Sequence, residues 1–408
     1  MILEIINKKR LGQELSYEEL DTIFNGYLKG NVPDYQMSSL LMAICINGMT
    51  DKEIFGLTKI FIDSGDVLDF SDIPGIKVDK HSTGGIGDKT TLVIAPIVAS
   101  LGIPVIKMSG RGLGYTGGTI DKLESIPGYR VDLTDEEISR QVKDINVVIT
   151  GQTGSLVPMD KVIYALRDVT ATVSSIPLIA SSIMSKKIAS GADKILIDIK
   201  VGNGALLQTK EEADKLSELM IKIGEEYKRE VRTIISDMNI PLGKCVGNSL
   251  EVLEAIDVLR GVEKDNNFVN LCYELATEMV SMGLSISKEK AHMMVKNSIE
   301  DGSAYQKFLE LVKSQNGNIE GIKVSEKTYD LCAQSSGTLK AINALEVGKL
   351  SLSLGAGKEN IDDTIDYTVG VKLNKLVGDS VEKGEVLATL YVKNDIPNVY
   401  VDRIFTIN

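Results

Sequence analysis

Short β-like runs alternate with helical segments from about residue 75 to residue 236, and this pattern narrows the possible folds more than any other. The helical segments include residues 134–145 and 210–227. The β-like runs read "IKV", "IPVIKMS", "YRVDL", "NVVIT", "KILIDIKV" and "VRTIIS". Alternation of this kind is typical of a mostly parallel sheet covered by helices. We therefore predict an α/β fold.

Both ends of the chain depart from this alternation. Residues 1–66 carry two capping boxes, Ser16 with Glu19 and Thr50 with Glu53, each followed by apolar residues at helical spacing. They predict a small all-α unit. Near the C-terminus, "VGDSVEKGEVLATLYV" and "NVYVDRIFTI" alternate like antiparallel strands around glycine turns.

A second helical stretch, residues 161–187, interrupts the α/β pattern and is rich in hydroxyl groups. It carries four basic residues against one acid, Asp168, and we expect it to pack with the N-terminal helices. The predicted domains are a helical domain, a large mostly parallel α/β domain and a β-rich C-terminal domain. Their ranges are 1–66 completed by 161–190, then 75–158 with 191–330, and finally 334–408.

Composition limits the partners. The 45 basic residues are outnumbered by 57 acidic ones, which disfavours a nucleic-acid or anionic-membrane surface and favours small-molecule substrates. No apolar run reaches the roughly 20 residues that span a bilayer, and the N-terminus becomes charged too early for a signal peptide. We expect a cytoplasmic protein. The four cysteines are scattered, so we expect buried thiols rather than a disulfide framework or a zinc site.

Three glycine-rich segments follow β-like runs: Gly84 to Gly87, Gly110 to Gly118 and Gly202 to Gly204. Ligands of parallel α/β sheets bind at the carboxyl ends of the strands. We therefore expect these three loops to converge on one site.

The first loop, "KHSTGGIGDKTT", matches neither the GxxxxGK[ST] pattern of nucleoside-triphosphate sites nor the GxGxxG pattern of dinucleotide sites. This argues against both kinds of nucleotide site. It offers Lys80, Ser82 and Thr91 beside backbone N–H groups, a set that suits a small tetrahedral anion. It also contains His81, one of only two histidines in the chain. The other, His292, lies on an apparently amphipathic helix and is interpreted as structural.

A second loop repeats the arrangement one β-α unit later. In "KMSGRGLGYTGGTIDKLESI", the side-chain donors are Lys107, Ser109, Arg111 and Thr119, and Thr119 opens a helix. Two loops with the features of anion sites follow neighbouring strands. It is therefore improbable that either is only a solvent-exposed glycine-rich turn without a ligand.

These motifs, together with "YALRDVTATV" and "SSIMSKK", resemble those of the thymidine and pyrimidine-nucleoside phosphorylase family over nearly the whole chain. The resemblance implies reversible phosphorolysis of uridine, thymidine and deoxyuridine to the free base and (deoxy)ribose 1-phosphate, in pyrimidine salvage. It implies inorganic phosphate as co-substrate and no organic cofactor. It also implies a homodimer formed through the helical domain, which carries the base site, and hinge closure onto the phosphate-binding α/β domain.

The resemblance assigns individual residues. The catalytic positions are His81, Arg167 and Lys186, and the substrate-binding positions are these three and Ser182. The phosphate-binding positions are Lys80, His81, Ser82, Thr91, Lys107, Met108, Ser109 and Thr119. His81 is the expected proton donor or hydrogen-bond partner of the base, which becomes negative as the glycosidic bond breaks.

Three positions distinguish this sequence from some relatives in the family. Tyr115 stands where many members have histidine. Lys107 matches the pyrimidine-nucleoside enzymes rather than thymidine-specific ones with methionine, and it can reach sugar hydroxyls, which favours acceptance of both uridine and thymidine. Lys89 stands where some bacterial relatives have a threonine ligand to potassium. The matching positions are Gly87, Lys89, Leu242, Cys245 and Glu254. A lysine ammonium can replace the ion, and the sequence leaves potassium binding and replacement both open.

Alternative functions remain at this point. A thymidine-specific phosphorylase shares the motifs. An anthranilate-type phosphoribosyltransferase resembles the family in fold but needs magnesium and a sugar diphosphate, and the full "SGRGLGYTGGT" run argues against it. A non-catalytic nucleoside-binding protein would bind uracil and phosphate without turnover.

Overall fold

The computed structural model describes residues 1–408 apart from 113–114, 116, 153, 360–361 and 394–398. The chain divides into two compact units. Unit 1 comprises residues 1–72, 153–197 and 209–233, and unit 2 comprises residues 73–152, 198–208 and 234–408. The boundary falls within two strands, β4 (Lys194–Val201) and β5 (Glu230–Asp237).

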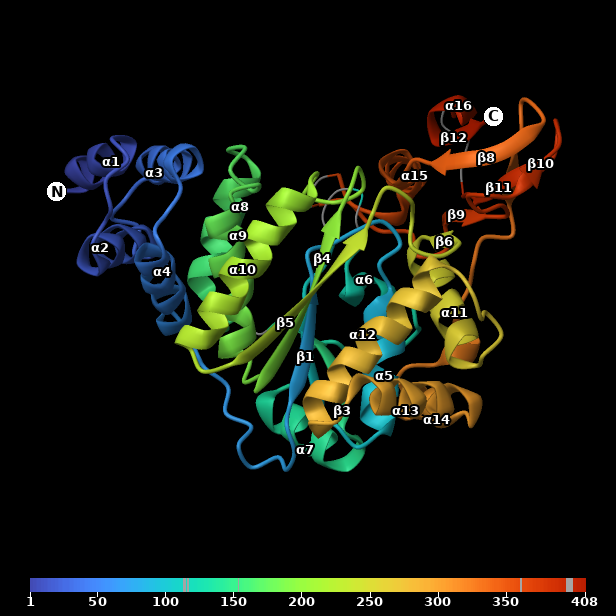
Figure 1. Cartoon of the computed structure of the whole chain (residues 1–408), viewed down its shortest axis with the longest axis horizontal. Helices are drawn as coiled ribbons and strands as arrows, with labels where there is room; N and C mark the ends of the chain where they lie inside the picture. Colours follow the sequence, from blue (N-terminus) through green and yellow to red (C-terminus); the bar gives the residue numbers. More distant parts are fainter. Residues whose placement is uncertain (113–114, 116, 153, 360–361, 394–398) are drawn as a thin grey trace. The chain divides into compact units, whose positions relative to one another are not determined.

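Unit 1 is helical apart from its share of these strands (Figure 1). Its helices are α1 (Ile2–Arg10), α2 (Tyr17–Leu28), α3 (Asp34–Asn47), α4 (Asp51–Asp63), α8 (Pro158–Asp168), α9 (Ile176–Ala189) and α10 (Lys210–Glu226). The second helical stretch packs with the N-terminal helices as expected, because α9 contacts α4 and α8 contacts α2 and α3.

Both predicted capping boxes form, at Ser16 with Glu19 and at Thr50 with Glu53. Glu53 is buried and also accepts two hydrogen bonds from Lys9 Nζ, at 2.7 and 2.9 Å. A residue that begins α4 therefore also fixes α1, which links local helix capping to the packing of the unit.

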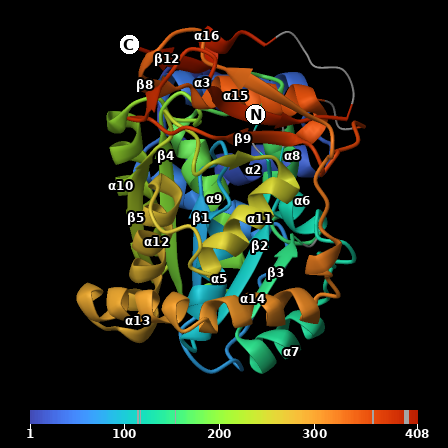
Figure 2. The same ribbon diagram turned by 90° about the vertical axis from the view of Figure 1, so that its right-hand side faces the viewer.

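Unit 2 contains the α/β body. Its first elements are β1 (Val78–Ser82), α5 (Thr90–Ser100), β2 (Val105–Ser109), α6 (Thr119–Glu124), α7 (Asp135–Ile145) and β3 (Val147–Gly151). Four further helices follow: α11 (Asn248–Leu259), α12 (Asn267–Leu284), α13 (Lys288–Glu300) and α14 (Ser303–Ser314). The sheet order is β1-β4-β5, and β2 pairs in parallel with β3. Helix α5 is apolar on all sides and buried, as expected of a helix packed between β-strands and the helices α12 and α14 (Figure 2).

The C-terminal part of unit 2 is rich in strands. It contains η1 (Ile319–Gly321), β7 (Thr328–Cys332), β8 (Gly337–Ile342), α15 (Ala344–Ser351), η2 (Leu352–Ala356), β9 (Gly370–Leu373), β10 (Ser380–Val381), β11 (Val386–Tyr391), α16 (Val401–Ile404) and β12 (Phe405–Ile407). Its antiparallel sheets have the orders β6-β9-β11-β7 and β10-β8-β12, where β6 is Cys245–Val246. Because β6 comes from the α/β body, backbone pairing joins the two parts of the unit. The predicted fold class, helical, mostly parallel α/β and β-rich parts in one chain, is confirmed.

One predicted strand is wrong, and another forms only in part. Residues 129–133 form no strand, because their backbone bonds go to separate partners: Arg130 N donates to Gln315 O, and Val131 O accepts from Gly151 N. In "NVYVDRIFTI", the first residue lies outside the described part of the chain, and α16 turns the chain before β12 pairs with β8.

The four cysteines do not share one environment. Cys245 and Cys272 are buried as predicted, but Cys45 is half-buried and Cys332 is exposed at the end of β7, an edge strand of its sheet. The expectation of four buried thiols is therefore wrong for Cys45 and Cys332.

Candidate active site

The first glycine-rich loop connects β1 to the buried helix α5. Gly84 and Gly87 have φ angles of 95° and 72°, which non-glycine side chains rarely adopt. Gly84 N donates to Ser82 Oγ at 3.1 Å, so the hydroxyl of Ser82 organises the turn. The next predicted phosphate contact, Thr91, is buried in the first turn of α5. A strand, a glycine turn and a buried helix therefore follow one another here, as the sequence predicted.

Lys80 lies in a buried cluster of charges at the base of this loop. Its Nζ donates to Thr90 Oγ1 at 2.7 Å and lies 3.3 Å from Asp198 Oδ2 and 3.9 Å from Asp88 Oδ2. Lys200 Nζ adds a second cation, 2.7 Å from the same oxygen of Asp198. The two lysines and two aspartates carry equal and opposite charge. The ammonium of Lys80, which the sequence assigned to phosphate, is therefore already neutralised by carboxylates of the protein.

The cluster holds Asp88 and Lys200 in their charged forms. Burial alone would raise the pKa of Asp88, but the charges of Lys200 and Lys80 outweigh it and hold that pKa well below its usual range. Burial alone would lower the pKa of Lys200, but Asp198 and Asp88 raise it above its usual value. Desolvation is large for both groups and the opposite charges overcome it.

His81 lies on β1 between Lys80 and Ser82. Successive side chains of a strand point to opposite faces, so His81 faces away from both of its neighbours. Lys80 is buried, whereas His81 and Ser82 are half-buried at the strand's end.

The second loop follows β2. Lys107, Met108 and Ser109 are buried at the end of that strand, and Lys107 Nζ lies 3.9 Å from Asp79 Oδ1. Because the Met108 side chain has no charged or strongly polar group, only its backbone suits the predicted phosphate contact. Thr119 is half-buried at the start of α6.

Acidic side chains hold this loop in place. Asp121 Oδ2 accepts from Gly112 N at 2.6 Å and from Gly118 N at 3.1 Å, so one carboxylate closes the loop. Arg111, a predicted donor, pairs with Glu124 instead, and that hydrogen bond raises its pKa. Leu113, Gly114 and Thr116 of the motif lie outside the described residues, and Tyr115 is exposed.

The three glycine-rich segments come together beside α15. A Cβ on Gly348 of α15 would lie 3.2 Å from Ile86 Cγ1 of the first loop and 3.3 Å from Tyr115 O of the second. A Cβ on Gly204 would lie 3.1 Å from the same Ile86 atom and 2.7 Å from Ala344 Cβ. The loops converge as predicted, and the helix beside them comes from the C-terminal region.

The predicted base-binding residues belong to α8 and α9 in unit 1. Arg167 is only 1% exposed, and its guanidinium donates to three backbone carbonyls: Thr172 O at 3.2 Å, Leu178 O at 3.2 Å and Val173 O at 2.7 Å. Burial lowers its pKa, and the nearby charge of Asp160 acts in the opposite direction. Arg167 therefore fixes the turn between α8 and α9 as well as supplying positive charge.

Lys186 is held by the same two helices. Its Nζ lies 2.7 Å from Asp160 Oδ2 and 3.2 Å from Ser182 Oγ, one turn earlier on α9. The ring of Tyr164 lies 6.0 Å from Lys186 Nζ and 5.8 Å from the Arg167 guanidinium carbon. The structure thus brings together the three residues that the sequence assigned to the base.

The positions predicted to hold potassium surround the ammonium of Lys89. Its Nζ lies 2.6 Å from Leu242 O, 3.0 Å from Gly87 O and from Cys245 O, and 2.8 Å from Glu254 Oε2. All five predicted positions therefore meet, with a lysine side chain at the centre. Among the described residues, no group of three or more His, Cys, Asp or Glu side chains could hold a metal ion.

Sequence reasoning missed the acidic partners of these cations. Asp160 pairs with Lys186, and Asp198 and Asp88 together balance Lys80 and Lys200. A signal for Asp198 was present, since it and Lys200 are the two charged residues inside the otherwise apolar strand run "ILIDIKV". Asp160 stands in an ordinary helical stretch and carried no such signal.

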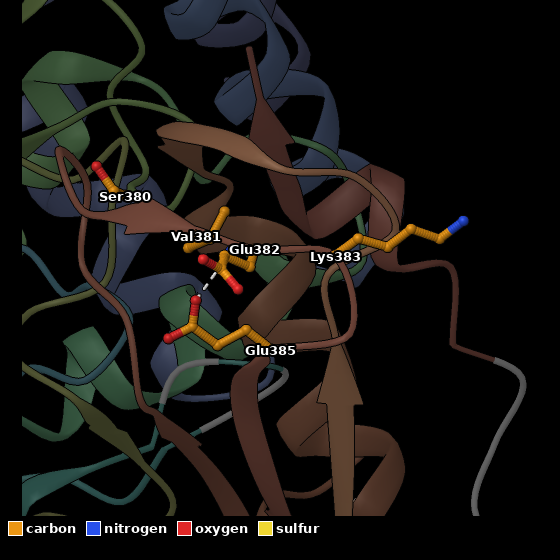
Figure 3. Close-up of a pocket in the computed structure, with 5 residues that line it drawn as sticks. All are labelled: Ser380, Val381, Glu382, Lys383 and Glu385. Atoms are coloured by element: carbon orange, nitrogen blue, oxygen red, sulfur yellow. Dashed lines mark hydrogen bonds between the residues drawn. The ribbon is translucent and has the colours of Figure 1, made fainter.

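A hollow of about 550 Å³ in the C-terminal strands lies among other residues: Ser380, Val381, Glu382, Lys383 and Glu385. The side chains of Glu382 and Glu385 lie close together and Lys383 points away (Figure 3). The two carboxylates disfavour an anionic ligand in this hollow. None of the described helices is long and apolar enough to span a bilayer.

Three family models match the chain. The glycosyl transferase family helical bundle domain matches residues 3–65, the glycosyl transferase family a/b domain residues 75–305, and the pyrimidine nucleoside phosphorylase C-terminal domain residues 338–405.

Curated relatives match over nearly the full length. The pyrimidine-nucleoside phosphorylases of Staphylococcus haemolyticus and of Geobacillus stearothermophilus are each 50% identical over 397 residues, which is 96% of this chain and 92% of theirs. The Bacillus subtilis protein of the same name is 48% identical over 97% of this chain and 92% of its own. Among solved structures, anthranilate phosphoribosyltransferase from Thermus thermophilus has a similar fold. The TM-score is 0.60 at 16% identity, over 76% of this chain and 99% of that one.

Proposed function

Because the chain belongs to the pyrimidine-nucleoside phosphorylase family, we propose that it catalyses the reversible phosphorolysis of uridine, thymidine and deoxyuridine. The products are the free pyrimidine and (deoxy)ribose 1-phosphate. The observation that carries the proposal is 50% identity over 96% of the chain to a phosphorylase of this name. The cluster of Lys186, Ser182 and Asp160 and the two glycine-rich loops support it. A role in pyrimidine salvage follows from the reaction, and the cytoplasmic location stays a prediction.

The chemistry requires one anion to be held and another to form. A phosphate oxygen attacks the anomeric carbon as the glycosidic bond to the base breaks, and the bonding electrons leave with the pyrimidine. The sugar gains positive charge and the base negative charge in the transition state. Cations near the base stabilise that state more than the neutral substrate, and this difference accelerates the reaction.

We assign this task to Arg167 and Lys186, with Ser182 as a further hydrogen-bonding group. The carboxylate of Asp160 positions Lys186 Nζ at 2.7 Å. His81 donates a hydrogen bond or a proton to the departing base near neutral pH. Lys80, Ser82, Thr91, Ser109 and Thr119 are the proposed phosphate contacts.

The test is phosphate-dependent release of base. Purified protein is incubated with uridine, thymidine, deoxyuridine or cytidine, with and without inorganic phosphate, and free base is quantified by chromatography. We expect release from the first three only when phosphate is present. Release from thymidine and deoxyuridine but not uridine would instead indicate a thymidine-specific enzyme. Binding of uracil and phosphate without turnover would indicate a nucleoside-binding protein.

An anthranilate-type phosphoribosyltransferase is the alternative that the fold alone would allow. It would consume anthranilate and phosphoribosyl diphosphate and require magnesium. We expect no such reaction, and we expect phosphorolysis to persist when a chelator removes magnesium.

Lys107 is the proposed determinant of sugar tolerance. Lys107→Met removes the buried ammonium near the end of β2. We expect kcat/KM for uridine to fall more than kcat/KM for thymidine, because only ribose carries the 2′-hydroxyl. An unchanged ratio of the two would exclude Lys107 as a sugar contact.

We also propose that the helical unit forms a homodimer. Helix α3 exposes Tyr35, Met42 and Ile46 at spacing that places them on one face, and Tyr35 and Ile46 are 72% and 75% exposed. Exposed apolar patches of this kind mark interaction surfaces. Ile46→Glu should convert a dimer to a monomer in light scattering, whereas Val262→Glu, at an exposed apolar residue of unit 2, should leave it a dimer. A wild-type monomer would refute the proposal.

A further inference from the structure

Lys89 is buried in a ring of oxygen atoms within unit 2. It is 1% exposed, and its Nζ has four oxygen neighbours between 2.6 and 3.0 Å. Three of these are backbone carbonyls, of Gly87, Leu242 and Cys245, and the fourth belongs to the carboxylate of Glu254. The ring of Phe268 lies 4.7 Å away on a further side.

We propose that the Lys89 ammonium serves as a built-in monovalent cation, so that the protein needs no potassium at this position. Rings of backbone carbonyls replace the hydration shell of potassium in proteins, and one carboxylate neutralises the single charge. An ammonium group has the same charge and a similar size, and it donates hydrogen bonds to the same oxygens. Lys89 therefore supplies covalently what a bound ion would supply from solution.

A potassium ion does not fit beside this side chain. The ion would have to share the carbonyls with the ammonium only a few ångströms away, and two like charges at such a separation repel strongly in a buried site. The carboxylate of Glu254 has no oxygen left for a second cation, because it contacts the ammonium and also accepts hydrogen bonds from Lys244 N at 2.7 Å and Cys245 N at 2.9 Å.

The surrounding charges keep Lys89 protonated. Burial alone would lower its pKa, but Glu254 and Glu251 outweigh the desolvation and raise the pKa above the usual value. Glu251 is itself shared with Lys122, at 3.3 Å, so its charge is partly compensated. The ammonium is therefore charged near neutral pH.

The position of the ammonium gives it a structural task. It ties Gly87 of the first glycine-rich loop to the segment that enters β6 and to α11, which carries Glu254. Gly87 has φ of 72°, and a Cβ there would lie 2.8 Å from Leu242 O. The cation therefore fixes the loop that precedes α5, and its loss should loosen that loop.

The experiment compares the wild type with Lys89→Thr, which shortens the side chain, opens the ring and adds a hydroxyl oxygen. Thermal unfolding is followed in potassium chloride, rubidium chloride and choline chloride at equal ionic strength. We expect the Tm of the wild type to be the same in all three salts. We expect Lys89→Thr to lose roughly 5–15 °C in choline and to regain much of it with potassium or rubidium in a saturable manner.

Two controls make the result specific. Lys9→Thr removes another buried ammonium, which binds the carboxylate of Glu53, and its loss of Tm should not respond to potassium. Adding Glu254→Gln to Lys89→Thr should abolish the rescue, because the carbonyl ring then lacks a negative charge.

Two outcomes would overturn the inference. The first is a wild type whose Tm rises in potassium compared with choline. The second is a folded Lys89→Thr protein with the same Tm in all three salts. If Lys89→Thr yields no folded protein in any salt, the wild-type comparison decides alone. The Tm readout does not depend on the proposed activity, so failure of one proposal can be distinguished from failure of the other.

Discussion

Truncation of Lys186 should affect stability and catalysis through two separable causes. Lys186 Nζ forms an ion pair with Asp160 at 2.7 Å, and Asp160 is buried, with an Oδ1 atom that has no hydrogen-bond partner among the described residues. Lys186→Ala therefore leaves a buried carboxylate without its nearest counter-charge, and it also removes a cation from the proposed base site.

The stability loss can be bounded from the burial of the pair. Breaking a buried ion pair costs about 3–5 kcal/mol. The side chain of Lys186 is 17% exposed and that of Asp160 is 6% exposed. Solvent at the lysine end reduces the cost, so we expect about 2–4 kcal/mol. Loss of one transition-state donor costs about 10² to 10³ in turnover.

The double variant Lys186→Ala/Asp160→Asn separates the two effects. It removes the stranded charge along with the ammonium, so most of the stability should return while the activity should not. Urea unfolding measures the free energy of unfolding of each variant, and kcat/KM for uridine phosphorolysis is measured at about 25 °C, well below unfolding.

Two results would refute this reasoning. A kcat/KM of Lys186→Ala within about threefold of the wild type would remove Lys186 from the mechanism, since a lost donor costs far more. Recovery of activity together with stability in the double variant would show that the single variant had lost activity only through its fold.

Three shorter predictions concern the glycine-rich loops. Asp198→Asn removes the carboxylate that positions Lys80, and we expect the KM for phosphate to rise about tenfold or more, which corresponds to about 1.4 kcal/mol. Saturation kinetics with phosphate measure this KM. An unchanged KM would contradict the assignment of Lys80 to phosphate. Asp88 has a lowered pKa, so it stabilises the fold above its ordinary pKa of 3.8, and this contribution is lost as pH falls through the lowered value. Urea unfolding of the wild type and Asp88→Asn should therefore differ most near neutral pH and converge in acid, and a gap that stays constant with pH would be the opposing result. Gly118→Ala should lower kcat/KM at least tenfold, because its Cβ would strike the backbone of the same loop. Gly110→Ala is the control and should retain activity, because there is open space around Gly110. Equal activity of the two variants would rule out close packing of the loop.

Much of the fold followed from local patterns. The capping boxes at Ser16 and Thr50 formed because each depends on residues three positions apart, and the alternation of runs indicated the α/β class. Residues 129–133 looked like a strand, but their hydrogen bonds go to distant partners that no local pattern reveals.

The candidate site divides in the same way. The motifs containing Lys80, Arg167 and Lys186 are long and specific, so the family resemblance assigned these cations to phosphate and base binding, and that assignment stays a prediction. What neutralises them became known only from the fold, since Asp198 lies more than a hundred residues from Lys80 and Asp160 lies 26 residues from Lys186, on a different helix.

Lys89 shows the difference most clearly. The family resemblance assigned five positions to a cation and left open whether an ion or an ammonium fills them. The choice depended on whether a flexible lysine side chain could reach carbonyls more than 150 residues away, and the packing of that segment against the first loop places them within 3.0 Å. Local chemistry follows from the residue type, but the partner of a buried charge is set by the fold, because burial makes an unpaired charge too costly to retain.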